Sequence, residues 1–215
     1  YLAFSLLGTA CVGVASYLAG RALLRDAVLA RLETTSRQKE TDIALWLEER
    51  LRDLRFLSTQ AASELSGASG PSGPSGSGAA ADQSERARVE RMARLLRNFT
   101  TTQPDVQEVL LLSPEGGRVL ASTEEAHVGD YRSMYNYYAQ GRHGPAVQSV
   151  YPSPESRRPI FTVSMPVAGH DGKLQAVLAV HLDLEPINRI IRARAGVDET
   201  GETYMVDGCN VMVAG

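Results

Sequence analysis

The first twenty residues constrain this chain most, because none of them carries a charged side chain and Arg21 ends the run. About 20 consecutive apolar residues are needed to cross the hydrocarbon core of a bilayer. The apolar core of a secretory signal, the alternative, is usually only about 7–15 residues long. Because the run continues directly into a helical pattern, we expect an uncleaved membrane span over residues 1–24. The chain also lacks an initiator Met, and we interpret it as a fragment of a longer protein.

A long amphipathic helix is predicted over residues 25–65, which contain no Pro and no Gly. Apolar residues recur there at spacings of three and four, as on one face of a helix. They are Leu29, Leu32, Ile43, Trp46, Leu47, Leu51, Leu54 and Leu57. Ser36 and Lys39 interrupt this stripe. Two interpretations stay open, a parallel dimer contact near the membrane and packing on the protein's own domain farther out.

Residues 66–81 contain only Ser, Gly, Pro and Ala, which is typical of a flexible loop. Asp82 and Glu85 then form a capping pair for a second helix that ends before Pro104.

The pattern becomes extended after Pro104. Apolar runs separated by turn signals predict strands over residues 106–112, 118–122, 147–151, 159–167 and 174–184. A short helix-like segment is expected over 131–140, and a closing helix over 185–194 with Pro186 in its first turn. Short consecutive strands joined by tight turns indicate an α+β domain, with one antiparallel sheet and helices on one side. We expect this domain to span residues 82–196, and residues 197–215 to begin a second one.

Charge and composition exclude several functions. The net charge is −3, so no basic excess is available for binding nucleic acid. Two Cys and four scattered His residues fit neither a disulfide framework nor the usual zinc spacings. Motifs of phosphate-binding loops, serine hydrolases, zinc proteases and redox proteins are absent from the sequence. We therefore expect no catalysis in this segment, no metal and no cofactor.

Four of the eight tyrosines lie within eight residues, namely Tyr131, Tyr135, Tyr137 and Tyr138. Tyrosine supplies an apolar wall and a hydrogen-bonding tip, which suits a small-molecule pocket. The alternative is that these rings fill the core between the sheet and a helix.

Several motifs, taken in order, resemble the double Cache sensor domains of bacterial transmembrane receptors. They are WLEERLRDLR at 46–55, VGD at 128–130 leading to Tyr137, Tyr138 and Gly141, SMPV at 164–167, VLAVHLDL at 177–184 and GETYMVD at 201–207. The resemblance covers residues 30–215. It implies a long N-terminal helix, a PAS-like sheet as the membrane-distal half and a truncated membrane-proximal half. It also implies that residues 1–20 are the first of two membrane spans and that the sensor lies outside the cytoplasm, in the periplasm. We expect the receptor to be a homodimer.

The resemblance further implies a small-molecule ligand, since family members bind amino acids, other small carboxylates or amines. In amino-acid-binding members an R-x-W-Y pattern supplies an Arg for the ligand carboxylate; here Tyr135 replaces that Arg and Tyr137 the Trp. His181 stands where the family has an Asp for the ligand amine. Tyr151 matches a pocket tyrosine, and Tyr138 keeps the aromatic wall.

Both charged anchors of the amino-acid-binding members are thus replaced. His181 and Arg158 can both donate charge-assisted hydrogen bonds, which makes a carboxylate ligand an open hypothesis. The alternative is that Arg158 is a solvated hairpin residue and His181 a satisfied strand residue. The complete candidate site is Tyr131, Tyr135, Tyr137, Tyr138, Tyr151, Arg158, His181 and Asp183.

The leading hypothesis is thus a ligand-sensing module of a transmembrane receptor, with a histidine kinase as its output. A chemotaxis receptor, a nucleotide cyclase or a phosphatase could carry the same sensor. Two hypotheses from other classes remain: a membrane-tethered structural domain without a ligand, and a membrane-anchored enzyme whose catalytic part lies outside this segment.

Overall fold

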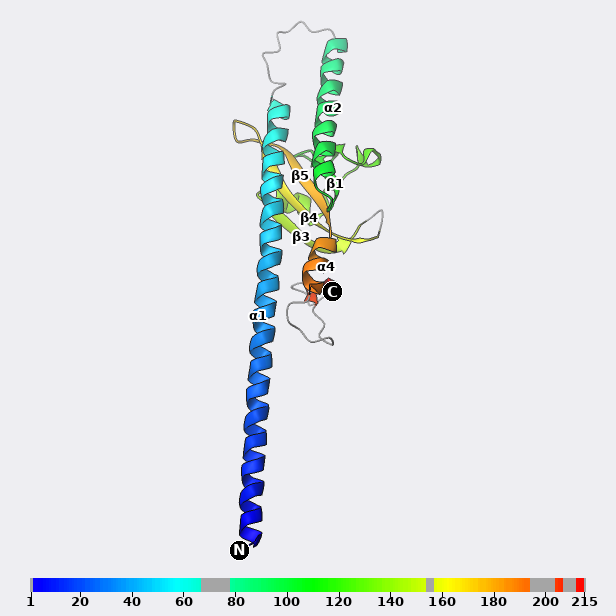
Figure 1. Cartoon of the computed structure of the whole chain (residues 1–215). Helices are drawn as coiled ribbons and strands as arrows, with labels where there is room; N and C mark the ends of the chain where they lie inside the picture. Colours follow the sequence, from blue (N-terminus) through cyan, green and yellow to red (C-terminus); the bar gives the residue numbers. More distant parts are fainter. Residues whose placement is uncertain (1, 67–77, 154–156, 194–203, 207–211, 215) are drawn as a thin grey trace.

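The structure, a computed structural model, describes the backbone of residues 2–66, 78–153, 157–193, 204–206 and 212–214. Side chains are described within these ranges except at 2–11, 78–82, 84, 85 and 212–214. The chain forms a long helix, a second helix and a five-stranded antiparallel sheet, which confirms the expected α+β class. Figure 1 shows both long helices on one side of the sheet. The expectation of helices on one side holds for these two, whereas the short helix Asn136–Gly141 packs on the opposite face.

Helix α1 (Leu2–Ser66) is continuous, because no Pro or interior cluster of Gly interrupts it. Its N-terminal half projects beyond the sheet, whereas its C-terminal half lies against it (Figure 1). Leu29 and Leu32 are accordingly exposed, and Leu54 and Leu57 are buried in the core. Packing on the protein's own domain is therefore confirmed for the second half of the helix. Dimerisation through the first half stays a prediction.

None of the helices in the described part of the chain contains a segment that is long and apolar enough to cross a membrane. Tyr1 and the side chains of residues 2–11, nearly half of the span expected over 1–24, lie outside the described residues.

The polar interruption of the helical stripe has a structural reason. Lys39 is buried where α1 meets helix α4 (Glu185–Arg192), and its Nζ donates a hydrogen bond to the carbonyl oxygen of Ile191. A cation at this position satisfies a carbonyl in the last turn of α4 and interacts favourably with the helix dipole.

Helix α2 (Gly78–Thr102) begins four residues before the expected Asp82 cap, since Ala79–Ala81 favour helix and extend it toward the loop. Residues 67–77 of the predicted loop lie outside the described residues. Helix α2 ends before Pro104, as expected, and leads into the first strand.

The sheet has the strand order β2-β1-β5-β4-β3, and all neighbours are antiparallel. Its strands are β1 (Val106–Leu112), β2 (Val119–Ser122), β3 (Ala146–Pro152), β4 (Pro159–Ala168) and β5 (Leu174–Asp183). The first hairpin thus pairs with the last strand of the sheet, so β1 and β5 lie side by side at its centre. This arrangement brings together residues that are far apart in the sequence.

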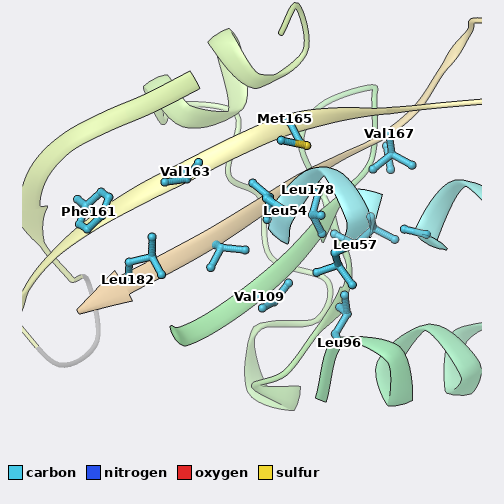
Figure 2. Packing of buried hydrophobic residues seen from close by; sticks show 14 of the residues in the cluster. Leu54, Leu57, Leu96, Val109, Phe161, Val163, Met165, Val167, Leu178 and Leu182 are labelled. Carbon is cyan, nitrogen blue, oxygen red and sulfur yellow. The ribbon is translucent and has the colours of Figure 1, made fainter. Parts of the chain in front are cut away.

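Alternation along the strands gives the sheet two different faces. One face packs against α1 and α2 through residues such as Val109, Leu178 and Leu182 (Figure 2). The other face carries a smaller apolar cluster that contains Leu110, Val177, Tyr137 and Tyr138. A segment containing the 3-10 helix η1 (Glu125–His127) and helix α3 (Asn136–Gly141) covers this second face.

A short hairpin follows α4. It consists of β6 (Met205–Val206) and β7 (Met212–Ala214), which form a separate two-stranded sheet. The first residues of the expected second domain, 197–203, lie outside the described residues. The domain boundaries given above therefore stay predictions.

Candidate functional site

Three adjacent strands place polar side chains side by side in the second face of the sheet. Glu108 on β1 pairs with His181 on β5, and His181 pairs with Thr162 on β4. All three side chains are buried although their strands are otherwise largely apolar. Buried polar groups in a native structure require partners and, as a rule, an explanation.

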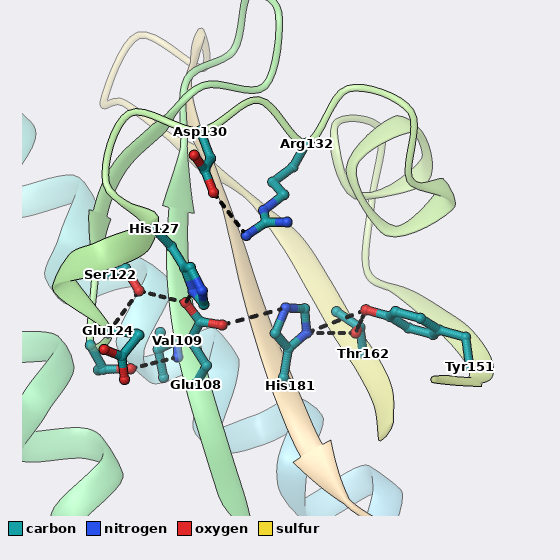
Figure 3. A network of polar contacts seen from close by, with 11 residues as sticks. Glu108, Val109, Ser122, Glu124, His127, Asp130, Arg132, Tyr151, Thr162 and His181 are labelled. Atoms are coloured by element: carbon teal, nitrogen blue, oxygen red, sulfur yellow. Dashed lines mark hydrogen bonds and ion pairs between the residues drawn. The ribbon is translucent and has the colours of Figure 1, made fainter. Parts of the chain in front are cut away.

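Hydrogen bonds connect these side chains to the covering segment and to β3 (Figure 3). Ser122 Oγ donates to Glu108 Oε1 at 2.6 Å, and His127 Nδ1 lies 2.6 Å from the same oxygen. The second carboxylate oxygen, Oε2, lies 3.9 Å from His181 Nε2. On the other side of the imidazole, Thr162 Oγ1 lies 2.7 Å from His181 Nδ1. We call Glu108, His127, Thr162 and His181 the polar cluster.

Tyrosine rings form a wall around the polar cluster. The Tyr151 hydroxyl lies 2.7 Å from Thr162 Oγ1, which extends the hydrogen-bond chain outward. The Tyr137 ring meets the His181 ring edge-on, with centroids 5.5 Å apart, and Tyr135 stacks on Tyr137 at 5.2 Å. Burial raises the pKa of the Tyr137 hydroxyl well above its ordinary value, so this group stays protonated and neutral.

Backbone contacts fix the position of the Tyr137 ring. The Tyr137 N–H donates to the Gln148 side chain at 2.9 Å, and its carbonyl accepts a hydrogen bond from Ser164 Oγ at 2.7 Å. Gly141 makes this close approach of α3 possible, because a Cβ there would lie 2.6 Å from Ser164 Oγ. These contacts join the Tyr137 backbone to β3 and β4.

A cation also lies at the site. Arg132 is mostly buried, its guanidinium carbon lies 5.9 Å from the centre of the Tyr135 ring, and its Nη2 lies 3.3 Å from Asp130 Oδ2. Figure 3 shows its side chain extending from the covering segment toward Glu108 and His181. Glu108 and Arg132 also both influence the pKa of the Tyr137 hydroxyl, the first raising and the second lowering it. The site thus combines one buried cation, one buried carboxylate and two imidazoles.

The structure brings four of the eight candidate residues together, namely Tyr135, Tyr137, Tyr151 and His181. Two more lie beside this group. Tyr138 fills the neighbouring apolar cluster, where its hydroxyl donates to the Pro114 carbonyl at 2.9 Å. Asp183 lies at the end of β5, and its Oδ1 accepts the Glu185 N–H at the start of α4.

The remaining two candidates lie apart from this group. Tyr131 is 67% exposed, and Arg158 is exposed in the turn between β3 and β4. The exposure of Arg158 agrees with its alternative as a solvated hairpin residue, whereas the exposed Tyr131 ring lies neither in the core nor in the tyrosine group.

Sequence reasoning missed four residues of this arrangement, namely Glu108, His127, Arg132 and Thr162. Glu108 carried one usable signal, because it is a lone charge beside the run Val109–Leu112 in a strand. His127 and Arg132 lie in irregular segments, where no periodicity indicates which way a side chain faces.

The side chains gathered at this site are charged, polar and aromatic. Within the described ranges, no group of three or more His, Cys, Asp and Glu side chains could hold a metal ion. The Glu108 carboxylate, the imidazoles and the Arg132 guanidinium offer charged hydrogen-bond partners, and the tyrosines offer flat apolar contact.

Comparisons with solved structures find receptor sensor domains. The sensor domain of the V. cholerae histidine kinase DctB has 14% identity and a TM-score of 0.59, over 79% of this chain and 61% of that one. The ligand-binding domain of the Pseudomonas aeruginosa amino acid chemoreceptor PctC, in complex with GABA, has 18% identity and a TM-score of 0.59, over 86% of this chain and 74% of that one. The Pseudomonas fluorescens chemoreceptor CtaA, in complex with L-alanine, has 13% identity and a TM-score of 0.59, over 86% of this chain and 70% of that one.

These similarities show the fold, and the chain spans only about 61% of the DctB structure. No match was found among curated proteins. A family model described as the Cache domain, of the double-Cache type, matches residues 20–215. The chain therefore belongs to the double-Cache family of sensor domains.

Proposed function

We propose that this chain is the extracytoplasmic sensing module of a transmembrane signal-transduction receptor, and that its ligand is a small carboxylate. The observation that carries this proposal is the polar cluster, which is buried in the sheet face opposite α1 and α2 and walled by Tyr135, Tyr137 and Tyr151. Family membership supports the sensing role. The charged and aromatic side chains of the site support the ligand class.

The choice of a carboxylate rests on the hydrogen-bond donors at the site. Arg132 and His181 can both donate hydrogen bonds to an anion. In this proposal Arg132, and not Arg158, is the arginine that donates to the ligand carboxylate. GABA and L-alanine, which occupy the PctC and CtaA structures, both carry a carboxylate. Asp183 is not required as a ligand contact, since it already accepts a hydrogen bond from α4.

A contact between β5 and α1 supplies a route for the signal. The Asp183 N–H donates to the Asp105 carbonyl at 2.8 Å, and the Asp105 carboxylate lies 2.7 Å from Arg50 Nε on α1. A ligand that moves the end of β5 would thereby bias the position of α1. The size of this bias is limited by the difference in ligand affinity between the two arrangements.

For the whole receptor, we propose a span over residues 1–24, a homodimer through the exposed half of α1 and a histidine kinase as output. The similarity in fold to the sensor domain of the histidine kinase DctB supports a histidine kinase as the output. PctC and CtaA support a chemotaxis receptor as the alternative output. A ligand-free structural domain is the candidate from another class, and it predicts that the tyrosine wall serves only as core.

A thermal-shift assay with succinate, propionate, GABA and L-alanine tests the sensing role. A ligand at about one hundred times its Kd stabilises a protein by about 2.7 kcal/mol, which is readily measured. We expect at least one of these probes to raise Tm, and His181→Gln to remove the increase. His170→Gln, which changes an exposed histidine in the β4–β5 turn, should keep it. No increase with any probe, or an equal increase in both variants, would favour the ligand-free alternative.

A further inference from the structure

Glu108 lies between two histidines in the buried site. His127 approaches one carboxylate oxygen at 2.6 Å, and His181 approaches the other at 3.9 Å. The side chains of all three are at most 14% exposed. Histidine is the side chain whose charge normally changes near neutral pH. Protonation of an imidazole at this position would change the net charge of the site.

The charged and titratable groups that face this site come from every element around it. They are Glu108 on β1, His127 after β2, Asp130, Arg132 and Tyr135 before α3, Tyr137 on α3, Tyr151 on β3, and His181 and Asp183 on β5. Arg132 keeps its positive charge throughout the accessible pH range, and it is paired with Asp130. Burial holds the Tyr137 hydroxyl in its neutral form by raising its pKa.

A bound carboxylate would add a second negative charge beside Glu108. Two carboxylates in one desolvated site repel each other strongly unless a proton or another cation compensates. A proton shared among Glu108, His127 and His181 would offset this added charge.

We infer that the site binds its carboxylate ligand together with a proton, which the Glu108, His127 and His181 group takes up. This inference rests on the proposed carboxylate-binding function. The sign follows from linkage: protonation favours the anion, so affinity is highest at low pH and falls as pH rises through the range in which the histidines lose their protons. The receptor would consequently report the ligand and the acidity of its surroundings together.

A purely structural role for Glu108 makes a different prediction. Its bonds to Ser122 and His127 could simply hold the covering segment on the sheet. In that case Glu108→Gln would lower stability and leave the pH dependence of ligand binding unchanged.

The experiment is isothermal titration of the wild-type protein with succinate and with propionate, which carry carboxylates and no amine. Titrations from about pH 5.5 to 8.5 span the usual range of histidine. Repeating them in buffers of different ionisation enthalpy counts the protons taken up. We expect uptake approaching about one proton per bound propionate, which carries a single negative charge, and an affinity that falls by up to about tenfold per pH unit.

Glu108→Gln removes the competing negative charge, so we expect it to abolish most of the proton uptake and to strengthen binding at high pH. Glu124→Gln, at an exposed carboxylate in the same segment, should behave as the wild type. Binding to the wild type without proton uptake would overturn the inference and leave the proposed function intact. Failure of both anions to bind at every pH would overturn the carboxylate site itself. The proton count on the wild type decides the question even if a variant does not fold.

Discussion

Two ion pairs that involve α1 have the same nitrogen–oxygen distance but differ in burial, so their contributions to stability can be compared. Arg50 Nε lies 2.7 Å from Asp105 Oδ2, and these side chains are 13% and 5% exposed. Arg37 lies 2.7 Å from Glu33, and those side chains are 76% and 65% exposed. Coulomb attraction weakens with solvent screening, so the first pair should matter far more.

The magnitude follows from burial. Removing one partner of a buried pair leaves an uncompensated charge and costs about 3–5 kcal/mol, whereas an exposed pair contributes about 0–1 kcal/mol. Arg50 has a second contact, with Asp53 at 3.1 Å, which places the expected loss for Asp105→Ala near the lower end, at about 3 kcal/mol. For a chain of this size that corresponds to a decrease in Tm of about 6–12 °C.

Urea unfolding of Asp105→Ala and Glu33→Ala tests this prediction. We expect the second variant to lie within about 1 kcal/mol of the wild type. The double variant Arg50→Met/Asp105→Leu removes both charges and should recover part of the loss. If Asp105→Ala lost no more stability than Glu33→Ala, the buried Arg50–Asp105 ion pair would not stabilise the contact between α1 and the sheet.

Three further substitutions check other parts of the structure. Leu57→Ala should cost about 2–5 kcal/mol in urea unfolding, because its side chain is 1% exposed, whereas the adjacent Phe56→Ala, at 67% exposure, should cost much less. Gly141→Ala should lower Tm measurably, since the added Cβ would lie 2.6 Å from Ser164 Oγ; an unchanged Tm would mean that α3 can move away freely. Tyr131→Ala should leave probe binding unchanged in the thermal-shift assay, because this ring lies outside the tyrosine wall, and a lost response would contradict that placement.

Periodicity in the sequence predicted most of the fold. The strand over residues 159–167 is observed as Pro159–Ala168, and the closing helix begins at Glu185 as expected. Such elements depend on local patterns of apolar residues, turns and caps, which a single sequence displays. The helix α2 began earlier than predicted because three alanines can extend a helix beyond its apparent cap.

The order of the strands could not be predicted in the same way. Pairing of β1 with β5 joins Glu108 to His181 across most of the domain, and no local pattern records such a contact. The candidate site was therefore identified in part only. Its tyrosines share a short segment and stand out by composition, whereas its buried carboxylate and its cation become visible only when the covering segment is placed on the sheet.

Arg158 illustrates the same limit. From the sequence, Arg158 was a candidate donor to a carboxylate ligand because it lies in a hairpin near the other candidate residues. In the structure its side chain is exposed, and the guanidinium that is buried near the site belongs to Arg132. Which of the two arginines is buried depends on the tertiary structure, and the residues of a turn do not indicate it.

The central claim is that the polar cluster and the tyrosine wall receive the ligand. A crystal structure of the protein grown with whichever of succinate, propionate, GABA and L-alanine raises Tm most tests it directly. We predict ligand density over the β1–β5 centre of the sheet, with a carboxylate within hydrogen-bond distance of His181 or Arg132. Density elsewhere, for example in the cavity of about 390 Å³ between α1 and α2 beside Phe56 and Phe99, would contradict the claim.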